Sequence, residues 1–151
     1  MADYNFATPR IAVGAAMRTA DDVRQAVKEG ITLVLDCWQE EDFSALWSTT
    51  RVRVVRCPTL DDGTTKKPAW FASGVVPALS VLVMPNAGKV LAHCCEGRNR
   101  APSMVYAILR AMGLNAAAAE AAIRECRPGV GLRYQADAEV AVKALGYTDH
   151  V

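Results

Sequence analysis

The chain has 151 residues, of which 52% are hydrophobic and 22% are charged, which excludes a disordered chain, a collagen-like chain and a coiled-coil rod. Its 17 lysines and arginines nearly balance 16 aspartates and glutamates, which argues against nucleic acid and against an anionic membrane as partners. At this length we expect one domain, residues 1–151.

Predicted strands and helices alternate along most of the chain. In chain order they are strand 10–13, helix 20–29, strand 31–35, a short helix 41–47, strand 51–56, helix 69–82, strand 89–93, and helices 101–112, 116–126 and 135–145. Thr19 opens the first helix as in a capping box, and Gly30 ends it. The run Ile-Thr-Leu-Val-Leu at 31–35 favours a buried strand. The order predicts an α/β fold with a central, mostly parallel sheet of four to five strands flanked by helices.

The number and spacing of the cysteines and histidines indicate which cellular compartment and which cofactors to expect. The five cysteines are odd in number, without a Cys-x-x-Cys pair, and only His93 and His150 supply imidazole, which argues against a disulfide scaffold and a closed zinc site. The N-terminus lacks the apolar core of a signal peptide, and the longest apolar stretch, residues 75–84, is too short to cross a bilayer. We expect a reduced, cytoplasmic protein with no metal, no cofactor and no membrane partner.

A predicted strand, a seven-residue loop and a predicted helix meet at residues 89–112. The first amides of a helix have no intrahelical partners and carry partial positive charge, so a phosphate-sized anion fits there. Gly97 permits the positive φ of a tight loop, and Pro102 suits the first helical turn. Arg100 offers a planar fork to two phosphoryl oxygens. Cys94 lies at the floor of this cradle, where the same groups stabilise a thiolate that can attack phosphorus.

The run from His93 and Cys94 to Gly97 and Arg100 resembles the His-Cys-x-x-Gly-x-x-Arg motif of the cysteine-dependent protein tyrosine and dual-specificity phosphatases. The resemblance covers about residues 31–145. It implies a phosphocysteine intermediate, a phosphorylated protein or peptide substrate, and no metal. It implies further that His93 orders the loop and that the intervening positions bind phosphate mostly through backbone amides. These phosphate-binding positions are Cys95, Glu96, Gly97, Arg98 and Asn99, together with Arg100.

The segment Leu60-Asp61-Asp62-Gly63 precedes Cys94 by about thirty residues, which is where the compact dual-specificity phosphatases have a mobile acid loop. A carboxylic acid there can protonate the leaving oxygen and then accept a proton from water. The Asp-Gly pair followed by Pro68 is similar to the acid loop of the regenerating-liver phosphatases. We predict Asp62 as the general acid, with Asp61 as the alternative.

Two further features resemble the regenerating-liver group. Ala101 follows the motif arginine, where most of the superfamily has a serine or threonine hydroxyl that speeds phosphoenzyme breakdown, so we predict slow turnover. Cys37 ends a predicted strand at the position of a backdoor cysteine, which makes it a candidate redox partner of Cys94 or else a small core residue. We expect structural roles for Cys57 and Cys126.

The sequence leaves other functions of the same fold open. Asn99 before Arg100 is similar to RNA 5′-phosphatases, although these often lack the acid and the chain is not basic overall. Phosphoinositide phosphatases usually carry lysines in the cradle, and this loop has none, although Arg98 could compensate. Ala101 makes a slow-turnover binding module credible. A rhodanese-type sulfur transferase fits poorly, because it lacks this pairing of aspartate and cysteine.

Overall fold

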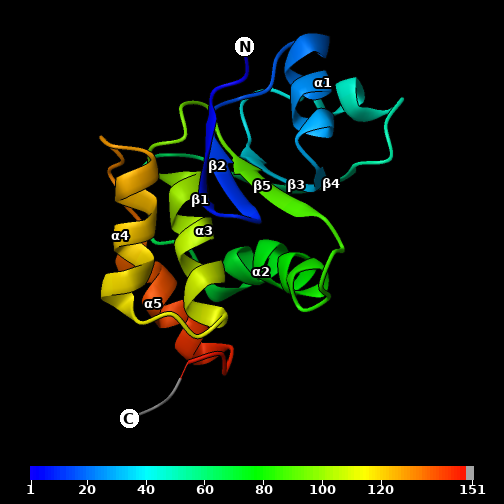
Figure 1. Ribbon diagram of the computed structural model, residues 1–151. Coiled ribbons are helices and arrows are strands. Elements are labelled where there is room, and N and C mark those ends of the chain that lie inside the picture. The colour runs from blue at the N-terminus through cyan, green and yellow to red at the C-terminus, as the bar shows by residue number, and fades with distance from the viewer. Residues whose placement is uncertain (149–151) are drawn as a thin grey trace.

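The protein, seen here as a computed structural model, is built on a five-stranded sheet in the order β1-β2-β5-β3-β4 (Figure 1). The structure describes residues 1–148; residues 149–151, including His150, lie outside the described residues. The strands are β1 (Tyr4–Thr8), β2 (Ile11–Gly14), β3 (Ile31–Trp38), β4 (Arg53–Thr59) and β5 (Lys89–His93). The helices are α1 (Ala20–Lys28), α2 (Pro68–Leu82), α3 (Arg100–Ala111), α4 (Ala116–Cys126) and α5 (Gln135–Ala144), with a 3₁₀ helix at Ser44–Trp47.

The two faces of the sheet are covered unequally. Helix α1 and the 3₁₀ helix lie on one face, and α2 to α5 lie on the other (Figure 1). Alternate residues of a strand point to opposite faces, so Val90 and Ala92 join the larger core, whereas Leu91 joins the smaller one. Helix α3 lies in the middle of the larger core and is buried along nearly its whole length. Its N-terminal turn is therefore held firmly against the sheet.

The predicted α/β class with a mostly parallel sheet is confirmed, with several differences in detail. Strand β3 runs beyond the predicted 31–35 to Trp38. Strand β1, antiparallel to β2 at the sheet edge, was not predicted, because a five-residue segment with a mixed pattern carries a weak signal. Strand β4 continues through Pro58 to Thr59 rather than stopping before it; β4 is an edge strand, where proline is tolerated. The short helix expected at 41–47 is limited to the 3₁₀ turn at Ser44–Trp47.

Parallel pairing places the loops that follow several strands at one edge of the sheet. Strand β5 pairs in parallel with both β2 and β3, and β3 pairs in parallel with β4. The carboxyl ends of β3, β4 and β5 therefore open onto the same edge, where ligands of open α/β sheets bind. The residues that follow them, near positions 40, 61 and 94, come together there.

Candidate active site

The loop between β5 and α3 is a tight cradle whose shape depends on Gly97. Its φ is +70°, and a Cβ at this position would lie 2.6 Å from the backbone carbonyl carbon of Gly14. Arg127 fixes the loop from outside: its Nε donates to the carbonyl of Gly97 at 2.9 Å, and its Nη2 donates to the carbonyl of Glu96 at 2.7 Å. Both hydrogen bonds use carbonyl oxygens of the loop and therefore do not occupy its amide groups.

Cys94 lies at the floor of this cradle and is only 3% exposed. Its Sγ accepts a hydrogen bond from the amide of Ala101 at 3.5 Å, in the first turn of α3. The sulfur therefore lies at the N-terminal end of a buried twelve-residue helix, which is the positive end of the helix dipole. The cavity above it has a volume of about 280 Å³. It is lined by Glu40, Asp61, Cys94, Cys95, Glu96, Arg98, Asn99 and Arg100.

Arg100 reaches the same cavity with one edge of its guanidinium unsatisfied. Its side chain is 4% exposed, and its Nη1 donates to Glu40 Oε1 at 2.6 Å and to the carbonyl of Thr59 at 2.8 Å. Its Nε has no partner, the only such buried side-chain nitrogen or oxygen within residues 1–148. A buried donor is costly to leave unpaired. An oxyanion bound above Cys94 would satisfy it.

The two aspartates of the acid loop have different surroundings. Asp61 lines the cavity, and its Oδ2 accepts from Asn99 Nδ2 at 3.0 Å. Its Oδ1 accepts from the Tyr134 hydroxyl at 2.7 Å and from Arg133 Nη1 at 3.2 Å. Burial raises the pKa of Asp61, but these hydrogen bonds and the charge of Arg100 outweigh burial and bring it below the usual value. Asp61 is thus held at the cradle by groups from two other segments.

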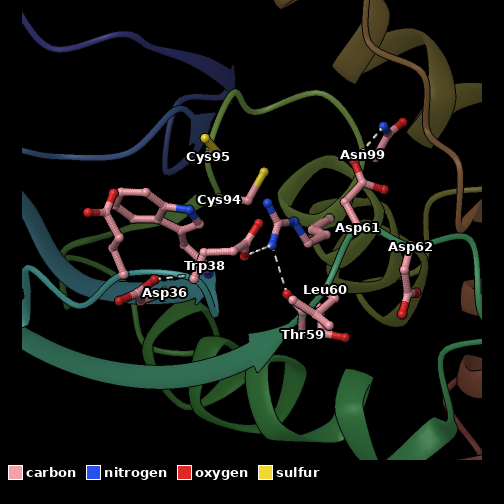
Figure 2. Close-up of polar contacts among 12 residues, drawn as sticks. Asp36, Trp38, Thr59, Leu60, Asp61, Asp62, Cys94, Cys95 and Asn99 are labelled. Atoms are coloured by element: carbon pink, nitrogen blue, oxygen red, sulfur yellow. Dashed lines mark hydrogen bonds and ion pairs between the residues drawn. The ribbon is translucent and has the colours of Figure 1, made fainter.

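Asp62, the first choice from the sequence, does not line this cavity. Its Oδ1 accepts from the Thr64 hydroxyl at 2.6 Å, from the Thr64 amide at 3.0 Å and from Lys66 Nζ at 3.2 Å. The hydrogen bonds from Thr64, followed by Lys66, hold the pKa of Asp62 far below its usual range. Figure 2 shows Asp61 directed toward Asn99 and Asp62 directed away from both Asn99 and Cys94. Asp62 is placed to close the turn, with Lys66 also donating to the Leu60 carbonyl at 2.6 Å.

The histidine before Cys94 belongs to a buried polar network below the loop. His93 is 4% exposed, its Nδ1 lies 3.4 Å from the carbonyl of Cys94, and its Nε2 lies 3.7 Å from Asp36 Oδ1. Asp36 also binds Arg56 Nη1 at 3.1 Å. Burial lowers the pKa of His93 despite the opposing charge of Asp36. A neutral ring packed beneath the loop fits a role in ordering Cys94 rather than in shuttling protons.

The structure also places the remaining predicted residues. Ala101 is fully buried, and the hydroxyl of Ser103 accepts from the Tyr134 amide at 3.2 Å, so Ser103 is engaged away from the sulfur. Glu96 and Arg98 form an exposed pair at 3.2 Å on the cavity rim. Gly97 shapes the loop but lines a neighbouring cavity instead. Of the predicted phosphate-binding positions, Cys95, Glu96, Arg98, Asn99 and Arg100 line the cavity with Cys94, and their binding of phosphate stays a prediction.

Three cysteines share the larger core at the site. Cys37, Cys57 and Cys94 are buried there, and all five cysteines are free. Burial, followed by the neighbouring Cys57 and Cys94, raises the pKa of the Cys37 thiol well above its usual value. Such a thiol is a weak nucleophile at neutral pH, although it lies near Cys94. A disulfide between Cys37 and Cys94 stays a prediction.

Glu40 and Tyr134 are the candidate functional residues that the sequence reasoning missed. Glu40 lies two residues after the end of β3 and binds Arg100, whereas Tyr134 precedes α5 and binds Asp61. The signal for Glu40 was present, because it follows the carboxyl end of a predicted parallel strand. Tyr134 carried no such signal, since only the packing of a distant loop brings it to the site.

The described residues hold neither a metal-binding cluster nor a membrane-spanning helix. Across residues 1–148, no group of three or more histidine, cysteine, aspartate or glutamate side chains is arranged to hold a metal ion. No helix in that range has both the length and the apolar character needed to cross a membrane.

Comparisons with solved structures show that the chain shares its fold with known phosphatases. No protein-family model matches the chain, and no curated protein matches it by sequence. Solved structures do match along nearly its whole length. Human DUSP28 is 21% identical, with a TM-score of 0.79 and 94% of each chain covered. PTPMT1 in complex with PI(5)P is 20% identical, with a TM-score of 0.77 and 95% of this chain and 99% of that chain covered.

A third match is the human tyrosine phosphatase-like serine/threonine/tyrosine-interacting protein, at 18% identity, a TM-score of 0.76, and coverage of 96% of this chain and 98% of that one. The chain therefore has the fold of the cysteine-dependent tyrosine and dual-specificity phosphatases, with a cysteine, an arginine and an aspartate around one cavity. The finer resemblance to the regenerating-liver group stays a prediction.

Proposed function

We propose that residues 1–151 form a single catalytic domain, a cysteine-dependent phosphoric monoester hydrolase that acts on phosphorylated proteins or peptides. One observation carries the proposal. The buried Nε of Arg100 has no partner, Arg100 and Cys94 line the same cavity, and Cys94 Sγ accepts from an amide in the first turn of α3. A phosphoryl group satisfies the guanidinium and the loop amides at once and presents its phosphorus to the sulfur.

The reaction proceeds in two displacements. The Cys94 thiolate forms a bond to phosphorus while the bond from phosphorus to the ester oxygen breaks, and Arg100 stabilises the equatorial oxygens. Asp61 donates a proton to the leaving oxygen, and we assign it this role in place of Asp62 because it lines the cavity. Water then attacks the phosphocysteine, Asp61 accepts its proton, and inorganic phosphate and the thiolate are released.

The proposed activity is tested with a panel of substrates at equal phosphate concentration. We expect hydrolysis of p-nitrophenyl phosphate and of a phosphotyrosine peptide, with weaker or no release of phosphate from a phosphatidylinositol phosphate and from triphosphorylated RNA. The measurement is phosphate release by the purified chain. Preferential hydrolysis of the lipid or the RNA would name the alternative phosphatase, and no hydrolysis by a folded chain would favour a binding module. The cytoplasmic location stays a prediction from cysteine usage.

Ala101→Ser tests the predicted slow breakdown of the phosphoenzyme. The amide of Ala101 already contacts Cys94 Sγ at 3.5 Å, so a hydroxyl at this residue adds a second donor near the sulfur. A new hydrogen bond to the departing thiolate should speed phosphocysteine hydrolysis about three- to tenfold. Rapid-quench measurement of the phosphoenzyme would show the change as a shorter lifetime. An unchanged lifetime in a variant of unchanged melting temperature would show that the missing hydroxyl does not limit turnover.

A further inference from the structure

The loop that carries Asp61 lies on the surface, and apolar packing does little to fix it. Residues 60–65 are all exposed, and Lys66 is the first buried residue after them. The geometry of this loop therefore depends on hydrogen bonds. One of these comes from Tyr134, which precedes α5 and is only 2% exposed. A buried side chain thus binds the exposed loop at the proposed general acid.

The hydroxyl of Tyr134 contacts the loop at two points. It donates to Asp61 Oδ1 at 2.7 Å and accepts from the amide of Gly63 at 3.0 Å. One oxygen atom therefore holds both the carboxylate and the backbone two residues beyond it. The phenol uses its single donor and also serves as an acceptor, so the orientation of the hydroxyl is defined.

Tyr134 is itself tied to the helix that begins at the cradle. Its amide donates to Ser103 Oγ at 3.2 Å, and Ser103 is fully buried near the start of α3. The same end of α3 supplies the amide that contacts Cys94 Sγ. A continuous set of contacts therefore runs from the helix at the nucleophile through Ser103 and Tyr134 to Asp61. The aromatic ring is rigid, so its anchored backbone and buried ring fix the place of the hydroxyl.

Two further donors bind Asp61, but neither is equivalent to Tyr134. Asn99 Nδ2 binds the other carboxylate oxygen, Oδ2, at 3.0 Å. Arg133 Nη1 binds Oδ1 at 3.2 Å, but its side chain is 49% exposed, where an ion pair contributes little. Tyr134 makes the shortest of the three contacts, and of the three donors only Tyr134 is a buried residue. Its hydroxyl is therefore the firmest hold on the carboxylate.

We propose that Tyr134 is a positioning residue for the general acid: its hydroxyl holds the Asp61 carboxyl at the cavity wall, within reach of the leaving oxygen. This inference rests on the proposed function, with Asp61 as the acid. Without the hydroxyl, Asp61 Oδ1 keeps only the exposed Arg133, and the amide of Gly63 loses its acceptor. Both the side chain and the backbone of the loop then move more freely. A displacement of about 1 Å can lower a rate on the order of 100-fold.

The effect of the hydroxyl on acidity has the opposite sign to its effect on position. Burial raises the pKa of Asp61, and the donors, Tyr134 among them, bring it below the usual value. Removing the hydroxyl therefore raises this pKa and increases the protonated fraction near neutral pH. If acidity were all that mattered, the variant would be faster than wild type. A slower variant identifies position as the dominant effect.

The experiment compares Tyr134→Phe with Tyr106→Phe as the matched control. Tyr134→Phe keeps the ring, which lies beside Lys66 Nζ, and removes only the hydroxyl. Tyr106 is also buried, and its hydroxyl donates to the carboxylate of Glu139, outside the active-site cavity. Each variant thus loses one hydrogen bond from a buried tyrosine to a carboxylate, and melting temperatures compare their stabilities. The measurements are kcat and KM on a phosphotyrosine peptide and on p-nitrophenyl phosphate.

We expect Tyr134→Phe to lower kcat on the phosphotyrosine peptide about tenfold, with KM within about twofold of wild type. The loss on p-nitrophenyl phosphate should be about threefold or less, because its leaving group has less need of a proton. Tyr106→Phe should stay within about twofold on both substrates. In an Asp61→Asn background, Tyr134→Phe should change kcat by less than about twofold, because the acid that it positions is already absent.

Several results would contradict the inference. Equal losses in Tyr134→Phe and Tyr106→Phe would mean that the hydroxyl acts through stability alone. A gain in kcat would mean that it only keeps Asp61 ionised, and an equal loss in the Asp61→Asn background would mean that it acts through another group. If Asp61→Asn alone keeps wild-type activity, the inference fails while the proposed hydrolysis stands. If wild type hydrolyses no substrate, the proposed function and the inference fail together.

Discussion

Cys94→Ser is expected to lower hydrolysis of p-nitrophenyl phosphate by about 10⁴-fold or more while tungstate binding persists. A serine hydroxyl is not ionised near neutral pH, so the loop amides and Arg100 have no anionic nucleophile to present. The substitution replaces sulfur with a smaller oxygen at a site that is 3% exposed. The backbone of the cradle does not depend on the sulfur, because Arg127 binds it and Gly97 allows its tight turn. The oxyanion site should therefore survive the loss of chemistry.

Cys126→Ser is the matched control for this result. Cys126 ends α4, and its Sγ contacts the Ile123 carbonyl, outside the cavity that holds Cys94. It should keep wild-type kinetics. Acid quench during turnover should trap phosphate on wild type and on Cys126→Ser but not on Cys94→Ser. Retention of activity within tenfold by Cys94→Ser, or trapped phosphate on that variant, would assign the nucleophile to another group.

The centre of the site could be read from the sequence because its parts are consecutive. Strand β5, the loop and helix α3 follow one another along residues 89–111, so periodicity and the chemistry of helix N-termini together indicate where Cys94 and Arg100 lie. The buried Nε of Arg100, which has no hydrogen-bond partner, agrees with the expectation that this arginine binds an oxyanion.

The residues around this centre could not be predicted from the sequence in the same way, because long-range packing brings most of them to the site. Asn99 joins the cradle to the acid loop through Asp61 and accepts from the amide of Arg133 at 3.2 Å, thirty-four residues away. From composition and spacing alone, either of two neighbouring aspartates in a turn could be the general acid. Thr64 ties Asp62 into a local turn, whereas Asp61, which lines the cavity, is held by the hydroxyl of Tyr134 from a distant segment, a contact that no local pattern encodes.

Asp61→Asn and Asp62→Asn should separate the two candidates for the general acid. Asp61 lines the cavity, so its loss is expected to lower kcat about 100-fold on a phosphotyrosine peptide, whose phenol leaving group needs a proton. The loss should be smaller on p-nitrophenyl phosphate, because p-nitrophenolate leaves more readily. Asp62→Asn should stay within about threefold, since an amide oxygen can still accept from Thr64. A larger loss for Asp62→Asn would restore the assignment made from the sequence.

The pH dependence gives an independent test of Asp61, and its sign follows from the hydrogen bonds around the carboxylate. Donors from Asn99, Tyr134 and Arg133, opposing burial, keep the pKa of Asp61 below its usual value, so near neutrality the protonated fraction is small and falls tenfold for each further pH unit. Above about pH 7 the substrate is a dianion whose charge no longer changes. The wild-type rate on the phosphotyrosine peptide should therefore fall as pH rises from 7 to 9, whereas Asp61→Asn should show a flat profile. A parallel decline in both would place the titrating acid elsewhere, because removing the carboxylate must remove the slope that it creates.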